Sequence, residues 1–200
     1  MTTWVEEPEG GRARGPRGLV RAWFEVFLRP QRFFRTGISP GDQAPGLTFV
    51  MTVVLIEEGV RLTLVPTAIP MIAGSRLASG ILTLMLAILL VTPAALHLVS
   101  GLQTILLVPI TTDRGGVSET VQVLGYATAP CVLAGVPSPT LRLICTVYGA
   151  SLYLLGLSIV HDLEPWQTAV AGLLPAGIVF GIAFRGFPAL VAVLEGWHVI

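Results

Sequence analysis

The sequence predicts an all-α fold, a polytopic bundle of about five transmembrane helices preceded by an amphipathic interfacial helix. Hydrophobic residues make up 53 % of the 200 residues and charged residues only 12 %, about half the charged share of an ordinary soluble domain. The chain also reads as long uncharged segments separated by short polar breaks. Because a helix crosses the hydrocarbon core in about 20 residues, these segments indicate an integral membrane protein.

Composition excludes several other classes of protein. Twelve Arg balance twelve acidic residues and Lys is absent, so the chain lacks the basic surplus of a nucleic-acid-binding protein. Two Cys are too few for a disulfide scaffold. The apolar, weakly charged composition is also unlike that of a disordered chain.

The charges concentrate near the N-terminus, where residues 10–36 carry seven Arg and one Glu. Residues 1–16 are rich in Glu, Gly, Arg and Pro, which predicts a disordered cytoplasmic tail. No apolar run precedes residue 17, so no signal peptide is expected. Because Arg is retained on the cytoplasmic side, we expect a multi-pass protein of the cell membrane with its N-terminus inside and, with five spans, its C-terminus outside.

Residues 17–36 form a predicted amphipathic segment. Arg21, Glu25 and Arg29 recur every four residues on one helical stripe, opposite a broad face of Trp, Phe and aliphatic side chains. Such a helix fits the headgroup plane of a membrane, and an ordinary helix packed on the membrane domain is the alternative. The candidate membrane-surface contacts are Arg21, Trp23, Arg29, Arg32, Phe33 and Phe34.

Residues 43–195 are expected to form the membrane domain, with five spans and with four or six as alternatives. The first span, from about residue 45 to 66, is the least regular because it carries charges in its body. The other expected spans lie within the uncharged stretches at about 78–108, 120–141, 143–160 and 165–184.

Four ionisable side chains fall inside the first two predicted spans: Glu57, Glu58, Arg61 and His97. A charge at the centre of a bilayer costs at least about 2.5 kcal/mol on insertion scales, so these groups need partners. Glu57 and Arg61 are four residues apart in the favourable order for a helical ion pair. One hypothesis is a polar site between spans one and two; the other is that the charges lie near the outer interface or pair internally.

No motif in the sequence indicates catalysis, a bound metal or a cofactor. The three His are isolated, the two Cys lie in different predicted spans, and a phosphate-binding loop of the Walker type is impossible without Lys. The first hypothesis is therefore a non-catalytic protein that organises the membrane or partner proteins. A small transporter or channel is the second hypothesis, and a membrane-embedded enzyme is the third.

The second half of the chain carries a series of short motifs. Gly115-Gly116 is followed by Gly125-Tyr126-Ala127-Thr128-Ala129-Pro130, and Gly156 precedes His161-Asp162-Leu163. Over about residues 26–185 this order resembles the Yip-one family, membrane proteins named for interaction with Ypt/Rab GTPases. The family-like residues are Gly115, Gly116, Tyr126, Pro130, Gly156 and His161.

The resemblance implies a cytoplasmic N-terminus, about five spans and no cofactor. Eukaryotic members act in vesicle traffic and membrane shaping, so the implied partners are the lipid bilayer and other membrane proteins or the protein itself. This chain lacks the long cytoplasmic region of many eukaryotic members, which argues against GTPase binding. Its compact, Lys-free sequence is typical of a small prokaryotic or archaeal branch.

Overall fold

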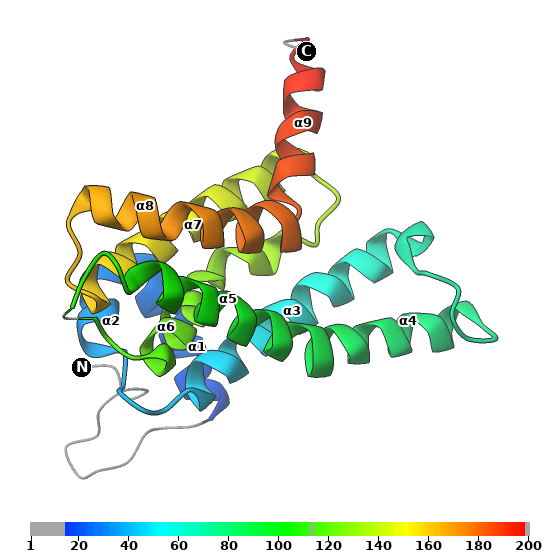
Figure 1. Cartoon of the computed structure of the whole chain (residues 1–200). Coiled ribbons are helices and arrows are strands. Elements are labelled where there is room, and N and C mark those ends of the chain that lie inside the picture. Colours follow the sequence, from blue (N-terminus) through cyan, green and yellow to red (C-terminus); the bar gives the residue numbers. More distant parts are fainter. Residues whose placement is uncertain (1–14, 113, 199–200) are drawn as a thin grey trace.

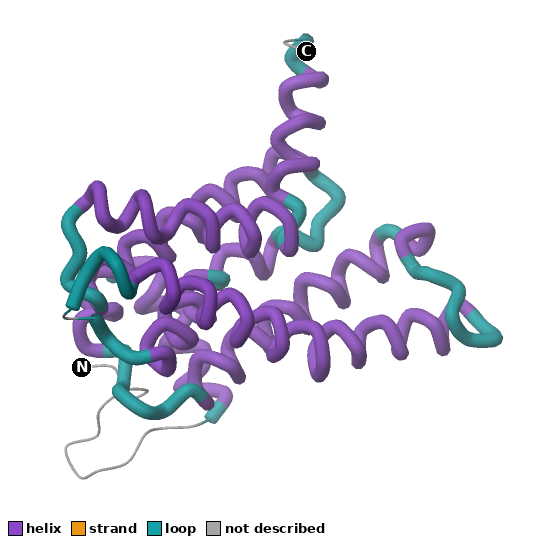
Figure 2. The backbone as a smooth tube through the Cα atoms, in the orientation of Figure 1, coloured by secondary structure: helices purple, strands orange, loops and turns teal. Residues whose placement is uncertain are grey.

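The structure is a computed structural model that describes residues 15–112 and 114–198; the predicted tail, residues 1–16, lies almost wholly outside them. Within these two ranges the fold is all-helical, as predicted (Figures 1 and 2). The α-helices are α1 (Pro16–Leu28), α2 (Pro30–Thr36), α3 (Ala44–Leu64), α4 (Arg76–Leu86), α5 (Thr92–Leu107), α6 (Val117–Ala127), α7 (Pro139–Val160), α8 (Pro165–Ala176) and α9 (Gly186–Gly196). The 3₁₀ segments are η1 (Pro66–Ala68) and η3 (Ala129–Leu133), and the π-helical segments are η2 (Ala87–Val91) and η4 (Gly177–Ala183).

Three helical stretches of the described chain are long and apolar enough to cross a membrane: Arg76–Leu107, Pro139–Val160 and Pro165–Ala183. They correspond to three of the five predicted spans, and the protein is a membrane protein. α3 is also long enough, at 21 residues, but it carries three charged side chains near its C-terminal end. The full count of five spans remains a prediction.

The uncharged stretch 120–141, in which one span is predicted, is not one continuous helix. α6 ends at Ala127 and passes into the short 3₁₀ segment η3 and then into a turn before α7 begins. Pro130 explains the break, because proline has no backbone N–H and its ring clashes with the preceding helical turn.

The helices pack around α6, which contacts α3, α5 and α7 and is buried from Thr120 to Ala127. α3 and α4 form a hairpin that projects beyond the other helices, whereas α9 leaves the bundle at a steep angle to α7 and α8 (Figure 1). α3 and α6 approach closely at two glycines: a Cβ on Gly125 would lie 2.5 Å from the carbonyl oxygen of Gly46. Small residues allow this backbone-to-backbone contact.

Candidate functional site

Two features of the structure are candidates for function: a cluster of charges between α3 and the end of η4, and the exposed side of α1. In the first, Arg185 donates from Nη1 to Glu58 Oε1 over 2.9 Å and from Nη2 to Glu57 Oε1. Arg61 donates from Nε to the other oxygen of Glu58 over 2.7 Å. We call Glu57, Glu58, Arg61 and Arg185 the charge cluster.

Two elements of the fold bring the charge cluster together. The two glutamates and Arg61 occupy consecutive turns of α3, where residues three or four apart share a face. Arg185 lies between η4 and α9 with a φ of 60°, at the corner where the chain turns out of the bundle. The corner directs the guanidinium to α3, so Glu57, only 2 % exposed, is neutralised.

The cluster corrects the predicted pairing in two respects. Arg61 pairs with Glu58, three residues before it, and Glu57 pairs with Arg185 instead of Arg61. His97 does not join the cluster: its Nε2 lies 2.9 Å from Oε1 of Gln43, at the opposite end of α3. Gln43 precedes Glu57 by 14 residues, about 21 Å along a helix, so the four predicted residues do not form one site.

Arg185 is the functional candidate that the sequence analysis missed. Glu57, Glu58 and Arg61 sum to one negative charge, and a buried surplus of this kind requires a further cation. This charge count indicates from the sequence that a further cation is needed, but the sequence does not indicate which Arg supplies it.

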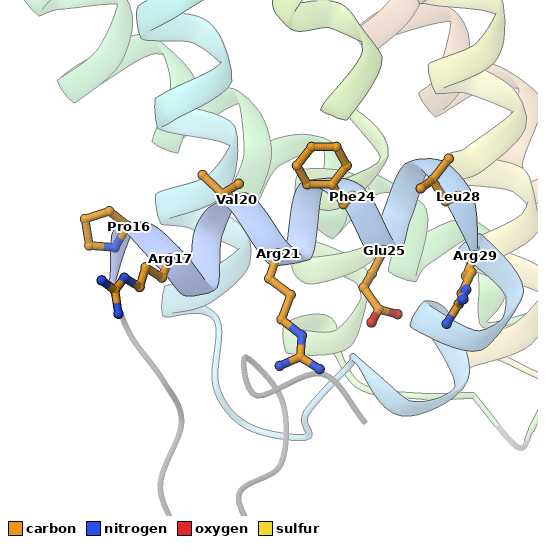
Figure 3. A pocket seen from close by; sticks show the side chains of 8 residues that line it. All are labelled: Pro16, Arg17, Val20, Arg21, Phe24, Glu25, Leu28 and Arg29. Carbon is orange, nitrogen blue, oxygen red and sulfur yellow. The ribbon is translucent and has the colours of Figure 1, made fainter.

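α1 presents two neighbouring rows of side chains along its outer side (Figure 3). Val20, Phe24 and Leu28 form an apolar row that points to the side where the spanning helices rise, and they are 51 %, 63 % and 74 % exposed. The neighbouring row consists of Arg17, Arg21, Glu25 and Arg29, and the two rows line one surface groove.

A third face of α1 holds the helix on the bundle. Ala22 and Val26 are fully buried, and the Trp23 indole donates from Nε1 to the carbonyl oxygen of Ala129 over 2.9 Å. The hydroxyl of Tyr148 in α7 donates to the carbonyl oxygen of Phe27 over 2.9 Å. α1 therefore packs on the bundle and also leaves an apolar row exposed.

Of the predicted surface contacts, Arg21, Arg29 and Arg32 are exposed, whereas the aromatic residues are buried to different extents. Phe33 and Phe34 in α2 are 0 % and 2 % exposed and belong to the core. Trp23 is half-buried, and its ring lies 4.9 Å from that of Phe49. The apolar contacts available on the surface are Val20, Phe24 and Leu28, which the sequence analysis placed on the apolar face without singling them out.

Three of the six family-like residues, Tyr126, Pro130 and Gly156, lie where the N-terminal helices, α6, η3 and α7 meet. Tyr126 is buried, with its ring 4.8 Å from that of Phe33 and 5.1 Å from that of Phe49. A Cβ on Gly156 would lie 2.8 Å from a methyl group of Val123. Pro130 is buried in η3. The contact of Tyr126 with Phe33 joins the N-terminal segment to the membrane domain, and the other two contacts lie within the membrane domain.

Gly115, Gly116 and His161 lie together at the end of the bundle where α6 begins and α7 ends. His161 is fully buried just past α7, with Nε2 3.1 Å from the Thr120 hydroxyl. A Cβ on Gly115 would lie 3.6 Å from the imidazole ring. Gly116 forms the N-cap of α6 in an extended conformation. Within the described residues no group of three His, Cys, Asp or Glu is placed to hold a metal ion.

The stability of the fold is expected to fall in mild acid because of His161. Burial lowers the pKa of this imidazole to about 4, whereas an unfolded chain has a His pKa of about 6.5. Between these pH values the unfolded chain binds a proton that the folded chain does not, so stability decreases as the pH falls. From pH 7 to pH 5 the loss is about 2 kcal/mol.

The measurement is the free energy of unfolding of the purified protein in detergent at pH 7, 6 and 5. His161→Gln is expected to remove most of the pH dependence, whereas His198→Gln, at an exposed position, is expected to retain it. Equal pH profiles for the wild type and His161→Gln would show that the imidazole is protonated equally in both states.

Among the comparisons with known proteins, the one with protein families gives a match. Neither the curated proteins nor the solved structures give a match. The Yip1 domain matches residues 24–185, which include α2 to η4, the charge cluster and all six family-like residues. The chain therefore belongs to the Yip1 domain family.

Proposed function

We propose that this protein organises the membrane without catalysing a reaction, and that α1 is the element that acts on the lipid. The observation that carries the proposal is the exposed row of Val20, Phe24 and Leu28 on a helix whose neighbouring row is mainly Arg. Membership of the Yip1 domain family and the membrane-spanning helices support a membrane role.

The energetics favour a membrane surface as the partner of this helix. Burial of a Val, Leu or Phe side chain contributes about 1.5–3 kcal/mol, so three such residues supply a substantial driving force. Each Arg near an anionic leaflet adds about 1 kcal/mol. A helix of this kind occupies area in one leaflet only, and this asymmetry is a way to bend or organise a bilayer.

The orientation of the chain is part of the proposal. The seven Arg among residues 10–36 favour a cytoplasmic N-terminus, which places α1 against the inner leaflet. With five spans the C-terminus lies outside. Proteins in contact with this surface, including a second copy of the chain, are the further partners we propose.

The transporter alternative receives less support from the geometry. Within the charge cluster two carboxylates are neutralised by two guanidinium groups, and His97 lies near the other end of α3. A conducting path between spans one and two would need polar groups that connect these two places.

The proposed position of α1 is tested by labelling its apolar row in liposomes. Cys131 and Cys145 are buried, so a Phe24→Cys variant of the full chain should be labelled selectively with an environment-sensitive fluorophore. We expect a strong blue shift of the emission in anionic liposomes, because the residue-24 side chain enters the hydrocarbon. Arg29→Cys, exposed and five residues beyond Phe24 on a different face of the helix, is the matched control and should keep the emission of an aqueous site.

Equal emission at the two positions would contradict the interfacial orientation. The organising role has a separate readout, the diameter of vesicles reconstituted with the protein. The wild type is expected to yield smaller or tubular vesicles, and Phe24→Ser combined with Leu28→Ser is expected to abolish the effect. Leu77→Ser, at a similarly exposed position in α4, should leave the effect intact.

A further inference from the structure

A cavity of about 150 Å³ lies beside the charge cluster, between α3, η2, α5, α6 and η4. We propose that this cavity binds a neutral lipid alcohol, with its hydroxyl on the glutamates and its apolar part in the cavity. The proposal concerns a different part of the molecule from α1 and does not depend on the membrane-organising role.

The walls of the cavity are apolar, and its mouth opens to the side of the bundle. Leu96, Leu124 and Phe184 are buried and line the interior. Val91 and Ala95 also line the cavity but are exposed on the outer surface. Because the surface of this bundle faces lipid, a ligand would enter from the bilayer.

Two of the walls of the cavity depart from regular α-helical geometry. Both π-helical segments, η2 and η4, contribute lining residues, Ala87 and Val91 from the first and Val179 and Ala183 from the second. A π-helical turn widens the helix and interrupts its regular hydrogen bonds, and such turns are frequent at functional sites.

The polar groups of the lining determine the chemistry of the ligand. Glu57 and Glu58 line the cavity, and Arg61 and Arg185 bind these carboxylates without lining it. The lining hydroxyls already donate elsewhere: Thr92 to the carbonyl oxygen of Ala87, and Thr128 to that of Gly125. The cavity therefore offers hydrogen-bond acceptors, so its ligand must be a donor.

The charge balance excludes an ionic ligand. An anion would meet two carboxylates at the cavity wall, whereas a cation would add to Arg61 and Arg185, which already neutralise them. A third guanidinium, that of Arg142, lies close by on the carbonyl oxygen of Ala134 and makes a further cation still less favourable. Because an uncompensated buried charge is costly, a neutral hydroxyl is the group that fits.

The size of the cavity limits the part of the ligand that enters. A dry apolar cavity of about 150 Å³ holds one benzene ring. The cavity therefore accommodates the hydroxyl and a ring or short chain segment next to it, and the rest of the lipid lies in the bilayer beyond Ala95.

The test uses the full chain in nanodiscs and a long-chain alcohol that carries a photoreactive diazirine close to its hydroxyl. We expect cross-links on α3 and on residues 87–96, located by mass spectrometry. Ala95→Phe fills the mouth and is expected to reduce labelling at least tenfold. Ile105→Phe, on the exposed side of the same helix α5, is the matched control and should label like the wild type.

Competition on the wild-type protein tests the hydroxyl contact without any risk of misfolding. Excess unlabelled alcohol should remove the cross-links, whereas the methyl ether, the ammonium and the carboxylate of the same chain should not. Equal competition by the ether, or labelling that Ala95→Phe and Ile105→Phe change equally, would show nonspecific lipid contact and overturn the proposal.

Discussion

Replacing Arg185 with Met is expected to lower the free energy of unfolding by about 3–5 kcal/mol, the usual cost when one partner of a buried ion pair is removed. Arg185 binds both glutamates, so the change leaves Glu57 without its hydrogen-bonded cation and Glu58 with Arg61 alone. Glu57 is 2 % exposed and cannot turn to water in the folded state. Met keeps a long, unbranched side chain at position 185, so the left-handed backbone there accommodates it as it does Arg.

The measurement is unfolding in mixed micelles, followed by circular dichroism. Arg76→Met, at an exposed position in α4, is the matched control and should change stability by less than about 0.5 kcal/mol. A double-mutant cycle identifies the partner: Glu57→Gln combined with Arg185→Met should cost less than the sum of the single changes. Additive losses in that cycle, or strong coupling of Glu57 to Arg61 instead, would contradict the pairing seen here.

The long apolar helices were predictable from the sequence because membrane insertion depends mainly on the length and hydropathy of a local segment. The uncharged stretch at 78–108 corresponds to the helical stretch Arg76–Leu107, and 165–184 corresponds to Pro165–Ala183. The stretch 120–141 satisfies the same criterion but is broken near Pro130. The mean hydropathy of a segment does not reveal such a break in the helix, whereas the proline inside the stretch indicates it.

The sequence could not predict which N-terminal aromatic residues are buried and which are exposed. Phe24 and Phe33 both belong to an apolar face next to Arg, but Phe24 is 63 % exposed and Phe33 is fully buried. Lipid and a protein core select the same side chains, so their identity alone does not separate the two environments. The packing of α2 on α7 decides that Phe33 is buried while Phe24 is exposed.

The charge cluster was half predictable for a related reason. Spacing predicts that Arg61 pairs with a glutamate one turn before it in the same helix, but it favoured Glu57, whereas the structure shows Glu58. The contact of Glu57 with Arg185 joins residues 128 positions apart and depends on the left-handed corner before α9. The cavity beside the cluster depends on the same tertiary arrangement, since five elements contribute to its wall.

Gly125→Ala is expected to lower the free energy of unfolding by about 3 kcal/mol, the upper part of the usual range for overpacking. The new Cβ would lie 2.5 Å from the carbonyl oxygen and 2.9 Å from the carbonyl carbon of Gly46. Both atoms belong to the backbone of α3, so no side-chain rotation relieves the clash and the two helices must separate. Separation loosens the buried contact of Phe49 with Tyr126, which lies at the same crossing of α3 and α6.

Gly101→Ala is the matched control, because Gly101 also lies inside a helix but a Cβ there meets nothing within 4 Å. This change should raise stability by about 0.5–1 kcal/mol through helix propensity alone. Gly46→Ala should resemble Gly125→Ala, since its Cβ would lie 2.7 Å from the Cα of Gln122 in α6. Because one separation of the two helices relieves both clashes, the double variant should lose less than the sum of the single losses. If Gly125→Ala proved as stable as Gly101→Ala, the direct contact between the backbones of α3 and α6 would be refuted.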